Sequence, residues 1–531
     1  MSKKHYHKKY LPLIIGTSIA MGLVINVLLN GNPSRFATNN TAQLKINQLL
    51  NYIEKDYVDE VNTDSIVSTM VNQMLENLDP HSTYIPKEEY LSVKENMQGE
   101  IVGIGISFYK IDDSIAVIQS LPNGPAKRAG ILPGDRILAA NGIQLHDQNL
   151  SNDSITKILK GRMNTNVDLK VKRQQINEPL NFSLSRNRIP IKSVNAGIPL
   201  NEKLGYIKIN RFAETTYTEF IEKLNQLKEE GVEDLILDLR DNGGGFLKEA
   251  IAIADEFLPD LTPILFTKNR TGKTKENFAS QKSGFLNGKL YVLINENSAS
   301  ASEIVAGAIQ DNDRGLIVGR RSYGKGLVQR EMKLADGSAV RLTVSRYYTP
   351  TGRSIQRPYT NGNLNYFNDY HKRFENGELV ERDSIQVNDS LQFTTPGGRV
   401  VYGGGGIVPD IFIPKELNNL DEDLDFMLKG GVIDRFVFDE LDSDRSFYNS
   451  LSKLDFEQFE ISEKMLQNYT DYLNKLAFDY NFETHEVKLK RFLSASIAKQ
   501  LFDEEEAYRI LTQSDPMIEA VQQHIQQKSA R

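Results

Sequence analysis

The chain has 531 residues, of which 40% are hydrophobic and 25% are charged. Both fractions are ordinary for a globular protein, and this length predicts three or four folded domains at about 150 residues each. The 63 Lys and Arg against 70 Asp and Glu give a net charge of −7, which argues against a nucleic-acid-binding surface. Because cysteine is absent, disulfides, thiolate metal sites and a cysteine nucleophile are excluded.

The first thirty residues predict a membrane anchor. Four lysines precede an apolar run over 11–29, which has 19 residues and no formal charge. A helix of that length spans about 30 Å of hydrocarbon. Because a lysine-rich flank stays in the cytoplasm, we expect residues 31–531 to lie in the periplasm or another extracytoplasmic part of the cell envelope. A long cleaved signal peptide is the alternative, and it gives the same destination.

Four regions follow, distinguished by their hydrophobic patterns. Helical spacing of apolar residues marks 31–97 as a helical module, and short strand-like runs between turn signals mark 98–175 as a small β-rich domain. Residues 204–347 alternate strand-like and helical patterns, which predicts a layered α/β core, and we assign 185–415 to this core. Two polar stretches, 268–288 and 357–402, are expected to be surface insertions. The remaining chain is charged, amphipathic and helical in pattern.

A strand-to-helix elbow carries three serines. A strand-like run over 290–296 precedes the sequence SASAS, and a helical pattern follows over 303–310. Such an elbow exposes a side chain at the end of a sheet and leaves N–H groups of the helix unpaired. Helix capping by Ser298, Ser300 or Ser302 is the simpler alternative. A serine nucleophile would therefore need a base nearby.

Lysine is the candidate base, because none of the seven histidines lies in this part of the chain. A lysine can accept a proton when burial or positive surroundings lower its pKa from about 10.4 to roughly 7 to 8. Lys325 lies between two glycines and before a strand-like run, although a solvated loop is the alternative. The same stretch matches a phosphate-binding loop, but Gly326 replaces the Ser or Thr that would hold Mg²⁺, which argues against an NTPase.

A third motif is the glycine run 243–245, which follows an apolar strand pattern and precedes a helical one. Glycine amides at a strand end can direct N–H donors at a developing oxyanion. A glycine-rich turn without a chemical role is the alternative.

Together these motifs resemble the C-terminal processing peptidases, also called tail-specific proteases. The resemblance covers residues 44–356 and 403–414. It rests on motifs that occur in a shared order: LDPHS at 78–82, GIGI at 103–106, GPA at 124–126, AGI at 129–131, PGD at 133–135, DLRDNGGG at 238–245, SASASE at 298–303, GKGLVQ at 324–329, YTP at 348–350, GR at 352–353 and GIVPD at 406–410.

The resemblance implies a multidomain α/β (α+β) fold. Its parts would be a crotonase/ClpP-like α/β peptidase core, an inserted PDZ domain, a helical N-terminal module and a helical C-terminal extension. It also implies an ATP-independent serine endopeptidase that needs no metal or other cofactor. In this resemblance Ser300 is the nucleophile, Lys325 is the general base and Gln329 orients the lysine. If 325–329 is a strand, Lys325 and Gln329 share one face.

An oxyanion hole is implied by the same resemblance. Its donors would be the backbone N–H of Ala301 and that of Gly244 or Gly245, each contributing about 2.7 to 4 kcal/mol. The family often has proline where Gly243 stands, so the choice between the two glycines stays open.

Residues 98–175 resemble a PDZ domain of the bacterial protease type. Gly103, Ile104, Gly105 and Ile106 can offer N–H groups to a terminal carboxylate while a substrate tail adds as a strand. The expected partners are therefore proteins or peptides with free C-termini, and in the family the PDZ domain also gates the active site. A β-rich spacer is the alternative for this region, and a catalytically inactive PDZ scaffold is the alternative for the whole protein.

Residues 357–402 and 416–531 exceed the shared core of the family. Helical extensions of this kind can mediate homodimerisation, cap an active-site tunnel or dock an adaptor, and the sequence does not choose among these roles.

Overall fold

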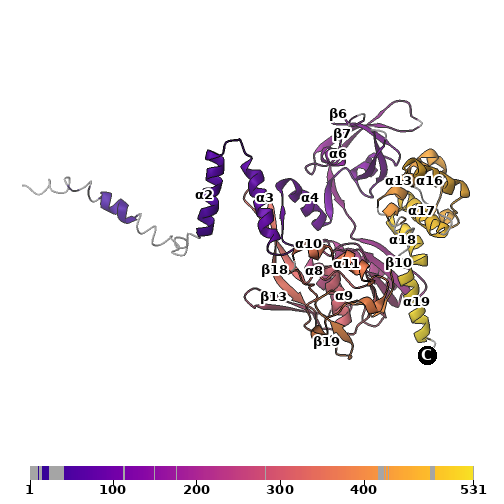
Figure 1. Cartoon of the computed structure of the whole chain (residues 1–531). Coiled ribbons are helices and arrows are strands. Elements are labelled where there is room, and N and C mark those ends of the chain that lie inside the picture. The colour runs from indigo at the N-terminus through magenta and orange to yellow at the C-terminus, as the bar shows by residue number, and fades with distance from the viewer. Residues whose placement is uncertain are drawn as a thin grey trace, which may run out of the picture. The chain divides into compact units, whose positions relative to one another are not determined.

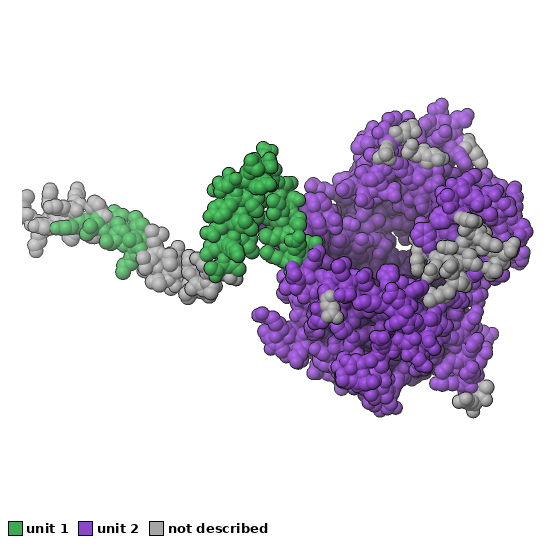
Figure 2. Space-filling model, viewed as in Figure 1, with its two compact units in different colours: residues 1–74 green, residues 75–531 purple. Residues whose placement is uncertain are grey.

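The computed structural model describes residues 10, 13, 15–22, 41–111, 114–146, 148, 150–174, 176–281, 283–360, 362–416, 424, 426–428, 430–478 and 485–529. It forms two compact units, Met1–Met74 and Leu75–Arg531 (Figure 2). The first unit contains α2 (Thr41–Asp56) and most of α3 (Thr63–Glu76). Among the described residues, no helix has the length and apolarity needed to cross a membrane, and the predicted anchor at 11–29 lies partly outside them.

The β-rich region of the second unit is an antiparallel sheet with strand order β3-β4-β5-β7-β8, and β6 pairs with β5. Side chains alternate between its faces, so Val167, Leu169 and Val171 of β7 are buried while their neighbours are exposed. The sheet extends to Ser185, beyond the predicted limit at 175, because β8 pairs with β7. The elements are β3 (Ile106–Ile111), β4 (Ser114–Ser120), α5 (Pro125–Ala129), β5 (Arg136–Ala140), β6 (Ile143–Gln144), α6 (Asn152–Leu159), β7 (Asn166–Lys172) and β8 (Leu180–Ser185).

This region joins the rest of the unit through two paired strands, β2 (Glu100–Gly103) and β9 (Asn187–Pro190). Helix α4 (Lys87–Gln98) precedes β2 and ends at Gly99, whose φ of 74° provides the left-handed cap. The chain therefore enters and leaves the β-rich region at one place.

The α/β core contains a six-stranded sheet with strand order β10-β11-β12-β15-β16-β21. All adjacent pairs from β11 onward are parallel, and β10 is antiparallel to β11. Every residue of β15 is buried, as expected for a parallel strand covered on both faces. The elements are β10 (Val194–Pro199), β11 (Leu204–Ile209), α7 (Thr216–Glu229), β12 (Asp234–Asp238), α8 (Leu247–Asp255), β15 (Leu290–Ile294), α9 (Ala301–Asp311), β16 (Leu316–Gly319) and β21 (Ile411–Phe412).

Helices cover the two faces of this sheet. Helices α7, α8 and α9 pack on one face, and α19 (Pro516–Ser529) packs on the other through Met517, Ile518 and Val521. Figure 1 shows α8 and α9 within the core and the yellow α19 at its side.

A second sheet has the order β1-β18-β13-β14, and β17 pairs with β18. The stretch 268–288, expected to be a surface insertion, supplies β14 as an edge strand. Its polar composition thus reflects the exposure of that edge strand. The strands are β1 (Thr83–Ile85), β13 (Pro263–Asn269), β14 (Thr274–Phe278), β17 (Leu327–Lys333) and β18 (Ala339–Tyr348).

Two further segments complete the unit. The insertion at 357–402 contains α10 (Asn363–Phe367), α11 (Asp369–Glu375), β19 (Gln392–Thr394) and β20 (Val400–Tyr402). The C-terminal region is helical, as predicted. Its principal helices before α19 are α13 (Val432–Ser443), α16 (Glu463–Lys475), α17 (Glu486–Leu501) and α18 (Glu504–Leu511).

Candidate active site

Ser300 lies at the turn between β15 and α9, where it is the N-cap residue of the helix. Its backbone has φ 55° and ψ −109°, a conformation that is uncommon for residues other than glycine. Two hydrogen bonds hold it: the Ser300 N–H donates to Glu303 Oε2 at 2.8 Å, and the Tyr347 hydroxyl donates to the Ser300 carbonyl at 3.2 Å. The elbow thus presents Ser300 to a cavity of about 930 Å³.

Lys325 lines the same cavity. Its Nζ donates to Gln329 Oε1 at 3.1 Å, and Gln329 Nε2 in turn donates to the carbonyl of His81. The structure therefore brings Lys325 and Gln329 together, and Ser300 lines the same cavity. Among the hydrogen bonds of the described residues, none joins Ser300 Oγ to Lys325 Nζ.

The surroundings of Lys325 favour its neutral form. Burial lowers the pKa of Lys325 below its ordinary value, and the positive charge of Arg341 lowers it further. The carboxylates of Glu303 and Asp79 act in the opposite direction but do not cancel the effect. A neutral amine facing the cavity can accept a proton from a hydroxyl.

One buried carboxylate connects the segment of Ser300 with that of Lys325. Glu303 Oε2 accepts hydrogen bonds from the N–H groups of Ser300 and Lys325, each at 2.8 Å. Its Oε1 accepts from Ser322 Oγ at 2.5 Å and from the Gly324 N–H at 2.6 Å. Burial raises the pKa of Glu303 even though these bonds favour the anion. Glu303 was not among the residues predicted for the site, although the Ser-x-x-Glu spacing from Ser300 is typical of a capping box.

The glycine run lies directly beside the elbow. Gly244 has φ 99°, and a Cβ there would lie 2.8 Å from the Cβ of Ser300. Gly245 has φ 149°, and a Cβ there would lie 2.1 Å from a backbone oxygen. The Gly244 N–H donates to Asn242 Oδ1 at 2.9 Å. In the described part of the chain, the N–H groups of Gly245 and Ala301 have no hydrogen-bond acceptor, so both are available to a ligand in the cavity.

Most described residues of the insertion at 357–402 are exposed, as expected for a surface segment, but a few of its side chains pack against the loop before Lys325. Arg373 of α11 is 2% exposed, and its guanidinium donates to the carbonyls of Arg321 and Ser322 at 3.0 and 2.9 Å. Burial of a cation requires such compensation by acceptors, which a polar composition alone does not reveal. The insertion therefore supports the backbone that carries Lys325.

Arg357 packs against two tyrosines, and one of them connects the insertion to Gln329 through His81. The guanidinium of Arg357 lies 4.0 Å from the ring centre of Tyr323 and 3.9 Å from that of Tyr366. The Tyr366 hydroxyl is 2.7 Å from His81 Nε2, and the carbonyl of His81 accepts from Gln329. Burial lowers the pKa of His81 to about 3, so its ring is neutral.

The predicted carboxylate loop lies at the junction of β2 and β3. Gly103 ends β2, Gly105 has φ 78°, and Ile106 begins β3. Ile104 is 2% exposed and packs into the core of the β-rich region. Because β3 is the edge strand of its sheet, one side of its backbone is open to pairing with an added strand.

Comparisons with known proteins agree with this architecture. The model of peptidase family S41 matches residues 203–363, that of the PDZ domain matches 102–185, and a family of unknown function matches 424–503. A carboxyl-terminal-processing protease of Synechocystis sp. is 36% identical over 295 residues, which cover 54% of this chain and 68% of that protein. One of Picosynechococcus sp. is 34% identical over 358 residues, covering 63% and 86%. A solved photosystem II D1 C-terminal processing protease covers 71% of this chain and 87% of its own at 25% identity, with a TM-score of 0.36.

These matches define a serine-type protease with a PDZ domain. The chain belongs to the carboxyl-terminal processing peptidases of family S41. The alternative of an inactive PDZ scaffold is not supported.

Proposed function

We propose that the protein is an ATP-independent endopeptidase that captures free C-terminal tails with its PDZ domain and cleaves them with Ser300 and Lys325. The observation that carries this proposal is the meeting of four groups at one cavity: the Ser300 side chain, the partly buried Lys325 amine, and the N–H groups of Gly245 and Ala301. A nucleophile, a base and two oxyanion donors are the parts that acyl transfer needs.

The reaction follows from these positions. Ser300 Oγ attacks the scissile carbonyl carbon as Lys325 Nζ takes the hydroxyl proton, and the carbonyl oxygen becomes an anion between the N–H groups of Gly245 and Ala301. The intermediate collapses, the C–N bond breaks, and the ammonium of Lys325 gives its proton to the leaving amine. Water then attacks the acyl carbon as Lys325 Nζ takes a proton from the water molecule, the ester bond to Ser300 Oγ breaks, and Lys325 returns the proton to Ser300 Oγ. Gln329 holds the lysine by its hydrogen bond throughout.

The pH dependence of cleavage should report the base. We expect kcat/KM to rise with pH and to level off above the pKa of Lys325, at a pH below 10.5, because the neutral amine is the active form. Arg341→Gln removes a charge that lowers this pKa, so the rising limb should move to higher pH. Arg330→Gln, on the exposed side of β17, is the matched control and should leave the profile in place. A rate independent of pH would contradict a lysine base.

The free terminal carboxylate of the substrate should be required for capture. We expect amidation of a peptide's C-terminus to weaken its binding to the full-length Ser300→Ala variant by more than about tenfold, because hydrogen bonds to a charged acceptor are lost. Calorimetry with the two forms of one peptide measures the difference. Acetylation of the same peptide's N-terminus is the control and should change nothing. Equal affinity for the free and amidated forms would reject recognition by residues 103–106.

We also propose that the catalytic domain works outside the cytoplasm, held to the membrane by an N-terminal helix. The support is the charge pattern of the sequence, in which four lysines precede the uncharged run 11–29. Fractionation of cells before and after a carbonate wash tests the attachment.

Mass spectrometry of exported proteins tests the proposed function as a whole. Cells with the active protein and cells with the Ser300→Ala variant should differ in the carboxyl ends of a defined set of exported proteins. Identical carboxyl ends in the two samples would contradict the proposal.

A further inference from the structure

The C-terminal helices form a body with its own core but take no part in the proposed chemistry. We call the helices from α13 to α19, residues 432–529, the helical module; it also contains the short helices α14 (Arg445–Tyr448) and α15 (Lys453–Glu457). Its buried residues, among them Phe436, Tyr469 and Leu493, pack on one another from α13, α16 and α17. The part of this module that matches a family model, 424–503, belongs to a family of unknown function. The contacts of this module with the PDZ domain and with the peptidase core indicate its role.

One aromatic side chain leaves that core and enters the surface of the PDZ domain. Phe438 of α13 is fully buried in a separate cluster with Ile111 of β3 and Ala116 of β4. Tyr109 packs edge-to-face on it with ring centres 5.7 Å apart. Full burial removes the whole phenylalanine ring from water, so this contact stabilises the docking of α13 on the sheet.

Polar contacts surround the ring on the same face of α13. Arg435, Phe438 and Asp442 are spaced i, i+3 and i+7, which places them along one side of a helix. Asp442 Oδ2 is 2.6 Å from a guanidinium nitrogen of Arg136 in β5, and the two side chains are 11% and 24% exposed. Arg435 donates to the carbonyl of Lys110 at 3.2 Å. Helix α13 therefore contacts three strands of the PDZ sheet, namely β3, β4 and β5.

This contact uses the face of the sheet that is turned away from the PDZ core. Ile115 and Val117 point into that core, while Ala116 and Ile118 between and beside them point toward α13. A substrate tail would add to the edge of β3 instead of its face. The helical module and a substrate tail can therefore bind β3 at the same time, the module at its face and the tail at its edge.

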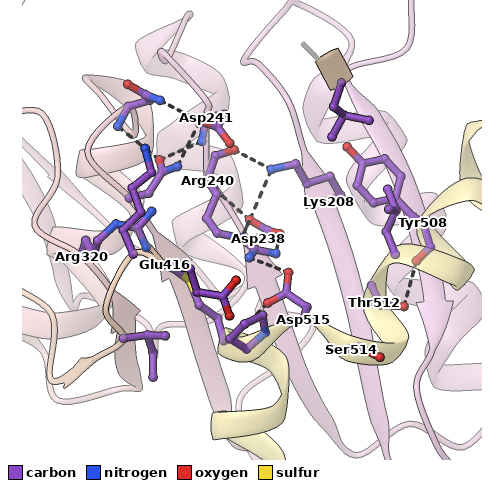
Figure 3. Close-up of a pocket in the computed structure, with 18 of the residues that line it drawn as sticks. Lys208, Asp238, Arg240, Asp241, Arg320, Glu416, Tyr508, Thr512, Ser514 and Asp515 are labelled. Carbon is purple, nitrogen blue, oxygen red and sulfur yellow. Dashed lines mark hydrogen bonds and ion pairs between the residues drawn. The ribbon is translucent and has the colours of Figure 1, made fainter. Parts of the chain in front are cut away.

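The other end of the module is fixed to the peptidase core. Asp515 accepts a hydrogen bond from Arg240 at 2.7 Å, and Arg240 lies in the loop that leads to the glycine run (Figure 3). Glu505 of α18 is 2.5 Å from Lys223 Nζ and accepts from the Gly197 N–H at 3.2 Å. Figure 1 shows the module beside the strands of the PDZ domain, with α18 next to β10 of the core.

We propose that the helical module docks the PDZ domain and fixes its position on the peptidase core, so that a captured tail is presented to the cavity of Ser300. Beyond the module, the PDZ domain joins the core through the strand pair β2 and β9 and through an ion pair at 2.8 Å between Lys160 and Glu95. A connection made of one short strand pair leaves few contacts to set the orientation of a domain, and such short connections are where hinges occur in proteins. The catalytic consequence rests on the proposed protease function, whereas the docking does not.

Charge reversal in the full-length protein tests the docking. Arg136→Glu and Asp442→Lys should each raise amide hydrogen exchange in β3 and β4 by about tenfold, and the double variant should restore protection. The advantage in kcat/KM of a tailed substrate over a short peptide without a tail should fall by a similar factor in each single variant and recover in the double. Lys464→Glu, an exposed site on α16 with the same charge change as Arg136→Glu, is the control and should behave like the native protein.

The outcomes separate the two proposals. Native-like exchange in both single variants, or a double variant no better protected than the singles, would overturn the docking. Phe438→Ala should also raise exchange in β3, and the charge reversals decide the matter if that variant does not fold. A native protein that cleaves neither substrate would reject the protease function, while the exchange result would still decide the docking.

Discussion

Replacement of Lys325 by alanine should reduce the rate of cleavage of a tailed substrate by at least about ten-thousandfold, and Ser300→Ala should do the same. The reason is that proton transfer and nucleophilic attack form one step, so loss of either group removes the whole step. Because neither residue belongs to the PDZ domain, binding of a C-terminal peptide should be unchanged. Single-turnover kinetics and calorimetry on the same preparations measure the two effects.

Two comparisons make this result specific. Lys273→Ala removes an exposed lysine from the turn between β13 and β14 and should retain native activity. The double variant of Ser300 and Lys325 should be no slower than either single variant, because residues that act as a unit are not additive. Substantial cleavage by Ser300→Ala would reject the assignment of the nucleophile.

Glu303→Ala should have the next largest effect, on both stability and cleavage. Its carboxylate accepts four hydrogen bonds in a fully buried site, so its removal would leave the N–H groups of Ser300, Gly324 and Lys325 unsatisfied. We expect a loss of about 3 to 5 kcal/mol in the free energy of unfolding. Cleavage should also be lost at temperatures where the variant is folded, because the turn and the loop are no longer joined. Thermal denaturation and activity below the transition measure both.

An exposed acid provides the control for that variant. Glu229→Ala, at the end of α7, should cost less than about 0.5 kcal/mol. Native-like stability of Glu303→Ala would contradict the role assigned to its carboxylate.

Local signals in the sequence were sufficient to find the candidate groups but not their connections. The elbow at Ser300 and the glycine run each follow a strand and precede a helix, so their patterns are visible within a dozen residues. The network behind Lys325 is different in kind, since His81 and Tyr366 are 285 residues apart. No periodicity or spacing predicts a contact of that range.

The same distinction between local patterns and long-range contacts applies to the fold. The parallel strands and their helices were predicted because buried strands form continuous apolar runs. The polar composition of the insertion at 357–402 correctly predicts a mostly exposed segment, but it does not reveal that Arg373 is buried and donates to the carbonyls of Arg321 and Ser322. A composition counts charges but does not show which acceptors compensate them. The amphipathic pattern of α13 likewise predicts that one face of the helix is buried, but it does not predict that this face packs on the PDZ domain.

The backbone at Ser300, the proposed nucleophile, restricts which residues can occupy that position. Ser300 has a positive φ of 55°, and a β-branched side chain is poorly accommodated there. Threonine carries an equivalent hydroxyl, yet its additional methyl group would have to be tolerated in this strained turn beside Gly244, which already lies against the Ser300 side chain. Only small unbranched residues can therefore replace Ser300 without disturbing the elbow. We expect a homologue that lacks this serine to lose catalytic activity while it keeps the fold.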